Sequence, residues 1–136
     1  MTYAAGDAVQ AALYDRLRGD AGLPALVGAA VHDRPPEGAL PPLYVLIGPE
    51  EVRDASDATG GGARHDVTVT VIATAAGFAP AKAAAAEVSR ALTEGAPPAL
   101  ARGRVVGIWF LRARGRIDGA AGARRIDLRF RLRIED

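Results

Sequence analysis

The sequence predicts an α+β fold, with a four-stranded, mainly antiparallel sheet and two helices packed on one of its faces. Three observations support this prediction. Apolar residues recur at helical spacing over residues 5–18 and 78–94. Apolar and polar residues alternate in four further segments. The segments follow the order helix, two strands, helix, two strands, and strands that follow each other closely usually pair as antiparallel hairpins.

The first helix is expected over residues 5–18, where apolar side chains recur every fourth position from Ala5 to Leu17. Gly19 ends it, and residues 23–27 are expected to form one further helical turn. The second helix is expected over residues 78–94, because its many alanines favour helix and allow close approach to a sheet.

Two strands are expected between the helices. Residues 31–34 have the pattern of a brief edge strand, but the prolines of residues 35–42 prevent regular pairing beyond it. The next strand is expected from Leu43 to about residue 54, and its partner over residues 65–74. The glycine-rich stretch 57–63 is expected to be a flexible connection that closes this pair into a long hairpin.

The last third of the chain, residues 105–135, has the pattern of two long strands with a turn near Asp118-Gly119. Each strand carries arginines at every second position: Arg112, Arg114 and Arg116 on the first, and Arg129, Arg131 and Arg133 on the second. A period of two places them on one face, opposite apolar residues such as Phe130. The sequence thus predicts a sheet with an apolar face sealed by its own helices and a basic face left uncovered.

The composition indicates one globular domain over residues 1–136, since 49% of the residues are hydrophobic. The chain has no cysteine, which excludes disulfides and thiolate chemistry. No signal peptide is expected at the N-terminus. No apolar run is long enough to cross a bilayer, so no membrane partner is expected.

The net charge of +1 hides an asymmetry, because residues 102–136 carry +6 and residues 1–101 carry −5. Such a molecule can meet copies of itself with unlike patches facing. Two other interpretations of the basic end remain open: a solvated face with local acidic partners, and contact with nucleic acid. Candidate acidic partners of the arginines are Glu50, Glu51, Asp54 and Asp66. The alternation predicts that Glu50 and Glu51 point to opposite faces.

Nucleic-acid recognition by a sheet usually requires aromatic residues among the basic ones. Alternation places Trp109 on the face opposite Arg112, and Phe130 opposite the second arginine row. Sequence-specific or single-strand binding is therefore disfavoured, whereas non-specific contact with DNA phosphates remains possible.

Catalytic signatures are weak. His32 and His65 are each followed by an aspartate, which would suit a metal site or an oriented base, but ordinary polar residues at strand starts have the same pattern. Neither Ser56 nor Ser89 lies in a nucleophile elbow. The triple glycine at 60–62 lacks the Gly-Lys-Ser/Thr of a phosphate-binding loop. No catalytic residue, cofactor or metal is therefore expected.

Several sequence features follow one another in a definite order along the chain. The leading helix with Leu13 and Leu17 precedes a proline-rich stretch and the run Leu43-Tyr44-Val45-Leu46-Ile47-Gly48. An Ala-rich helix ending at Leu92 and a terminal Arg-Phe-Arg-Leu-Arg-Ile-Glu run follow. This order resembles the small tail-completion, or tail-terminator, proteins of long-tailed phages and gene transfer agents, over nearly the whole chain.

The resemblance implies a structural, non-enzymatic virion protein that forms a homo-hexameric ring at the head-proximal end of a tail. Such a ring ends tail-tube polymerisation and joins the tail to the head connector or stopper protein, while DNA passes through its centre. The expected partners are other copies of the chain, the tail tube protein and the connector, and the expected location is the tail neck of a particle assembled in the bacterial cytoplasm. The arginine rows, with the four acidic candidates, are then expected at a subunit boundary or the ring lumen. The alternatives are a small basic nucleic-acid-binding module and a small hydrolase or metal enzyme that uses a histidine.

Overall fold

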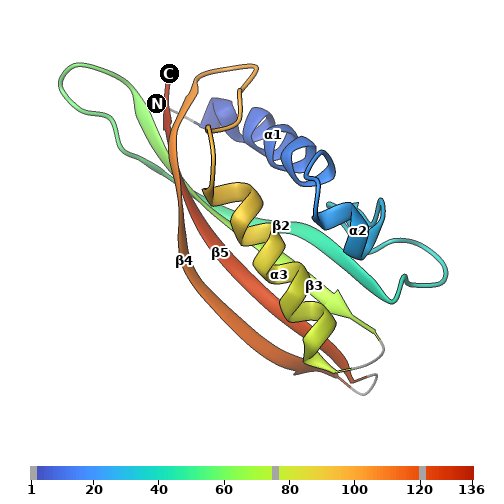
Figure 1. The fold of residues 1–136 in the computed structure, drawn as a ribbon. Helices are drawn as coiled ribbons and strands as arrows, with labels where there is room; N and C mark the ends of the chain where they lie inside the picture. The colour runs from blue at the N-terminus through green and yellow to red at the C-terminus, as the bar shows by residue number, and fades with distance from the viewer. Residues whose placement is uncertain (1–2, 75–76, 120–121) are drawn as a thin grey trace.

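The computed structural model describes residues 3–74, 77–119 and 122–136, and its sheet and helices confirm the α+β prediction (Figure 1). The helical elements are η1 (Tyr3–Ala5), α1 (Gly6–Arg18), α2 (Leu23–Val27) and α3 (Phe78–Thr93). The strands are β1 (Val31–His32), β2 (Leu43–Asp54), β3 (Gly62–Ala73), β4 (Arg104–Asp118) and β5 (Ala123–Glu135).

The strands form one five-stranded sheet in the order β1-β2-β3-β5-β4. All neighbouring strands are antiparallel except β1, which runs parallel to β2 with Val31 opposite Val45. The predicted number of four strands is thus one too low, because the brief edge segment at Val31–His32 joins the same sheet. The last two strands exchange places relative to chain order, so β5 lies inside the sheet and β4 forms an edge.

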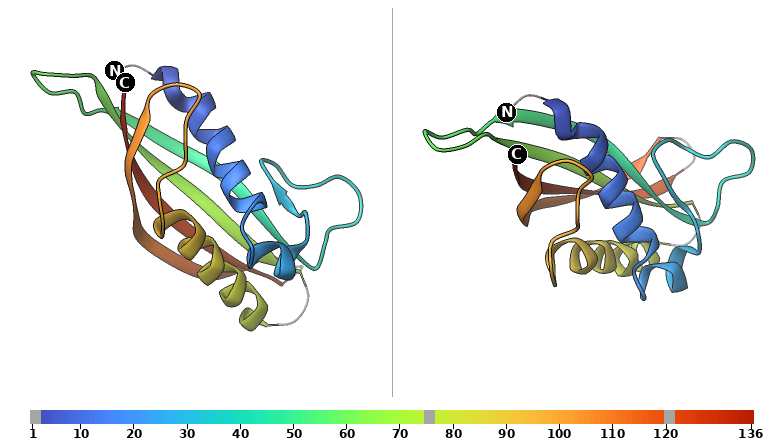
Figure 2. Two further views of the ribbon diagram at one scale, coloured as in Figure 1. Left: turned by 45° about the horizontal axis from the view of Figure 1, so that its top comes forward. Right: turned by 90° about the horizontal axis from the view of Figure 1, so that it is seen from above.

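The helices lie on one face of the sheet, called the helix face here (Figure 2). Helix α3 packs on β3, β5 and β4, while α1 packs against β1 and β2. The helix face of β5 carries the core side chains Ile126, Leu128, Phe130, Leu132 and Ile134, all buried. This confirms the predicted alternation on the last strand, and Phe130, which is fully buried, lies between Val67 of β3 and Phe110 of β4.

The opposite face, called the open face here, has no helix over it. At the start of β2 it is nevertheless apolar, since Tyr44, Leu46 and their neighbour Ile72 are buried. Toward β5 and β4 it becomes polar and basic. The prediction of a basic face left wholly uncovered is therefore correct only for the half of the sheet that β5 and β4 form.

Bulges in β2 and β4 alter the alternation. In β2 the register shifts between Ile47 and Glu50, at Gly48-Pro49, so Glu50 lies on the helix face and Glu51 on the open face, as predicted. In β4 the register shifts at Leu111, which places Trp109 opposite Arg131. The prediction that Trp109 and the arginines occupy opposite faces is wrong, because a bulge moves every residue on one side of it to the other face.

The helix face of β4 is not sealed by the chain's own helices, contrary to expectation. Phe110 is 47% exposed and Ile117 is 59% exposed, although both lie on the helix face. Phe110 still packs edge-on against Phe130, with ring centroids 5.9 Å apart. The edge strand thus presents apolar side chains and one side of its backbone to the surroundings, a combination typical of strands that pair with another chain.

Candidate assembly surface

The arginine surface consists of open-face arginines from the two C-terminal strands: Arg112, Arg114 and Arg116 on β4, and Arg125, Arg129, Arg131 and Arg133 on β5. The register sets Arg112 directly opposite Arg129 and Arg116 opposite Arg125. Like charges directly opposite each other destabilise a sheet unless acidic groups lie between them. The acidic residues of this surface therefore decide which arginines remain available to a partner.

Asp66 on β3 pairs with two arginines of the second row, Arg131 and Arg129. Arg131 donates two hydrogen bonds to its carboxylate, at 2.8 and 3.0 Å, and Arg129 lies 3.8 Å away. The hydrogen bonds from Arg131 hold the pKa of Asp66 below its usual range. This two-point pairing, on a largely buried carboxylate, fixes Arg131 within its own subunit.

Asp127 has a similar role at the other end of the surface. Thr70 donates to one of its oxygens at 2.8 Å, and Arg116 donates to the other at 3.0 Å. Partial burial tends to raise the pKa of Asp127, but these hydrogen bonds outweigh it and the pKa is lowered. Arg125 is held in turn by Asp118, at 3.1 Å.

Arg112 and Arg114 differ from these arginines. Neither makes a hydrogen bond or ion pair with any residue in the described part of the chain. Both line a cleft of about 300 Å³ on the open face, together with Thr68, Arg129 and Pro49. Trp109 lies on the same face and is 51% exposed. Its indole covers Gly107, and a Cβ at position 107 would lie only 2.9 Å from the ring. On β5, Arg133 likewise makes no hydrogen bond or ion pair with the described residues, but it lies at the end of the strand in a cleft with Asp57 and Glu135.

The predicted acidic partners fall into two groups. Glu51 and Asp66 lie on the open face within 3.8 Å of Arg129, although Arg53 binds Glu51 more closely, at 2.7 Å. Glu50 lies on the helix face, where it accepts a hydrogen bond from Tyr3. Asp54, at the end of β2, accepts a hydrogen bond from Ser56 at 2.7 Å. The structure thus brings only Glu51 and Asp66 to the predicted arginines.

The two histidines lie on different strands. His65 is fully buried on the helix face, and its Nδ1 atom lies 3.8 Å from a Glu50 oxygen. Burial lowers the pKa of His65 against the opposing effect of Glu50. His32 lies on β1, beyond β2 from His65. In the described ranges, no three His, Cys, Asp or Glu side chains are grouped as metal ligands would be, and no helix is long and apolar enough to span a membrane.

Sequence reasoning missed the exposed apolar surface of β4. Of the eight large apolar residues exposed in the described chain, five lie on this strand: Val106, Trp109, Phe110, Leu111 and Ile117. The uninterrupted run Ile108-Trp109-Phe110-Leu111 was the available signal, because a strand with one solvent-facing side seldom has four consecutive apolar residues.

Comparison with known proteins identifies the family. The family model of the tail completion protein gp17 matches residues 11–135. The chain belongs to this family. A chain in the structure of the virion of a native gene transfer agent particle has the same fold, with a TM-score of 0.92 and 58% sequence identity. The alignment covers 99% of the present chain and 100% of that chain. No curated protein matches.

The family assignment confirms the resemblance read from the order of segments. Tail completion proteins are structural proteins and not enzymes, so the expectation of a non-enzymatic chain is confirmed by the family.

Proposed function

We propose that this chain is a virion component of a gene transfer agent or phage-like particle, where it forms a ring at the head-proximal end of the tail. The ring ends tail-tube polymerisation and joins the tail to the head connector. The observation that carries this proposal is the 58% identity, over essentially the full length of both chains, to a chain of a gene transfer agent virion.

The surface of the subunit supports self-assembly. A 15-residue edge strand with exposed apolar side chains, free arginines on the same strand and a charge split along the chain all favour contacts between unlike surfaces of successive copies. Contacts of this heterologous kind close into a ring when the rotation between copies divides a full turn.

The test is deletion of the gene from a cell that makes the particles, followed by electron microscopy. We expect overlong tails and heads without tails, and restoration by the intact chain. Native mass spectrometry of the purified neck should give several copies per particle. Normal tails joined to heads in the deletion strain, or a single copy per particle, would contradict the proposal.

A second candidate function, contact with DNA phosphates, is favoured by the unpaired Arg112 and Arg114 beside Trp109. Binding to a short duplex should weaken with salt, and an Arg112→Ala/Arg114→Ala variant should lower the log–log salt slope by about 2. Absence of binding at low salt would remove this candidate.

A further inference from the structure

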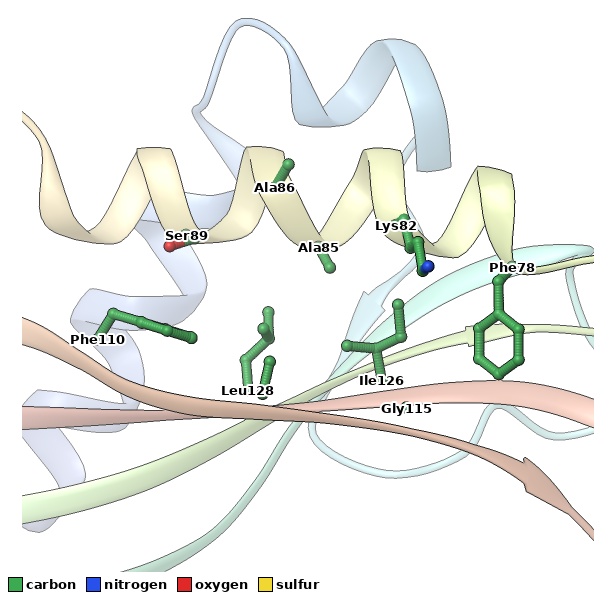
Figure 3. Close-up of a pocket in the computed structure, with 10 residues that line it drawn as sticks. Phe78, Lys82, Ala85, Ala86, Ser89, Phe110, Gly115, Ile126 and Leu128 are labelled. Atoms are coloured by element: carbon green, nitrogen blue, oxygen red, sulfur yellow. The ribbon is translucent and has the colours of Figure 1, made fainter.

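A groove separates α3 from the β4 edge of the sheet (Figure 3). Its volume of about 560 Å³ lies in the range of sites that enclose a small ligand or a few side chains. The lining is mostly apolar and includes Phe78 and Ala85 from α3, Phe110, Ala113 and Gly115 from β4, and Leu128 from β5. Gly115 adds no side chain to the groove near Phe78, where a Cβ would make ordinary van der Waals contact with the ring at 3.4 Å. The groove exists because α3 packs over β5 but covers β4 only partly.

One end of the groove is cationic. The ammonium group of Lys82 lies 5.9 Å from the centre of the Phe78 ring, and the Arg124 guanidinium lies 5.6 Å from it. None of the residues that line the groove is acidic. Lys82 makes no hydrogen bond or ion pair with the described residues. The groove therefore suits an apolar segment that carries a carboxylate at one end.

The chain itself contains such a segment in the loop of residues 33–42, between β1 and β2. Leu40 is 48% exposed there, and Glu37, also exposed, makes no ion pair with any described residue. Four prolines restrict the loop, so little conformational entropy is lost when it binds. The loop lies beside the β1–β2 side of the sheet, whereas the groove lies at the β4 edge on the other side (Figure 1).

We propose that the 33–42 loop of one copy docks in the groove between α3 and β4 of the next copy, with Leu40 in its apolar part and Glu37 beside Lys82 and Arg124. The spacing fits. Three residue steps, from Glu37 to Leu40, span at most about 10 Å. From the cationic end at Lys82, the same distance reaches Ser89 along α3, since seven helical residues rise about 10 Å.

The second copy is the favoured occupant because loop and groove lie on opposite sides of one sheet. Every subunit then presents both halves of the contact, and the same contact repeats from copy to copy. This inference rests on the proposed ring and names the surfaces that would build it.

The first test compares Leu40→Asp with Leu26→Asp, a matched control on α2 that is 44% exposed. Both variants should keep the wild-type urea midpoint. Native mass spectrometry of particles carrying each variant should show at least a tenfold loss of the ring for Leu40→Asp and no loss for the control. An intact ring with Leu40→Asp, or equal loss in both variants, would overturn the proposal.

The second test locates the loop, and it uses the absence of native cysteine. A Leu40→Cys/Ala86→Cys variant should form disulfide-linked multimers in oxidised particles, because a disulfide needs Cα atoms within about 7 Å. Each single variant, and Leu26→Cys/Ala86→Cys, should give none. A multi-copy ring without linked species would overturn the docking but leave the ring intact, whereas a single wild-type copy per particle would overturn the ring as well.

Discussion

Strands β4 and β5 have nearly the same sequence pattern and very different surroundings. Both carry three arginines at alternate positions, and they pair with each other along their length. On β5 the apolar side is buried beneath α3, and Arg131 is bound by Asp66 of the same subunit. On β4 the apolar side is exposed, and Arg112 and Arg114 have no partner among the described residues. The comparison shows that position in the sheet, rather than pattern, separates a strand that stabilises the subunit from one available for contacts.

The largest effect that tests this comparison is expected at Phe130 and Phe110, the two phenylalanines in edge-to-face contact. Phe130→Ala should lower the free energy of unfolding by about 3–5 kcal/mol, because it leaves a cavity in the fully buried core. Phe110→Ala should cost only about 1 kcal/mol, since its ring is 47% exposed and mainly contributes the edge-to-face contact. Urea denaturation measures both changes. Equal losses would show that β4 is as much a part of the subunit core as β5.

The second-largest effect on stability is expected at Asp66, the acidic partner of Arg131 on β5. Asp66→Asn should destabilise the fold by about 1 kcal/mol at pH 7, a modest value because Arg131 is partly exposed. The pKa of Asp66 is lower in the folded than in the unfolded state. Its stabilisation is therefore complete above the unfolded pKa, about 4, and is lost as the pH falls through the folded pKa.

Urea denaturation between pH 7 and pH 2 should accordingly show the variant and the wild type converging below about pH 4. Glu51→Gln is the matched control, because its ion pair with Arg53 is largely exposed and should contribute much less to stability than the Asp66–Arg131 pair. A difference between Asp66→Asn and wild type that persists at pH 2 would mean that the carboxylate charge is not its cause.

A third test uses the buried histidine beside β5, since His65 lies opposite Leu132. Its pKa is lowered by burial, so the unfolded chain binds a proton that the folded chain does not. Stability should therefore fall as the pH drops from about 6.5 toward the folded pKa. The His65→Leu variant should lose this slope below about pH 6.5. An unchanged slope in the variant would assign the pH dependence to other groups.

The sequence predicted each element separately better than it predicted their arrangement. Helix α3 starts at Phe78 and β2 at Leu43, as the periodicities indicated, because local propensity and burial set these positions. Strand order was not accessible, since alternation reports two faces of a strand but not its neighbours. The bulge at Leu111 was equally hidden, because an extra apolar residue in an apolar run has no signature of its own. The Asp66–Arg131 pair depended on the strand order, because it forms only where β5 lies beside β3 in the observed register.

The smallest effect on stability, and the most specific effect on assembly, is expected on β4. Arg112→Ala and Arg114→Ala should change the free energy of unfolding by less than about 0.5 kcal/mol, because neither side chain is paired within the described subunit. If these arginines contact a neighbouring copy, the connector or DNA, the double variant should lower the yield of joined particles several-fold while leaving the urea midpoint unchanged. Arg102→Ala, which removes an arginine that is also exposed but lies before β4, is the control and should leave the yield unchanged. Normal joining of particles with the double variant would place the essential contacts in the apolar side chains of β4. A large loss of stability would show instead that Arg112 and Arg114 stabilise the subunit, as Arg131 on β5 does.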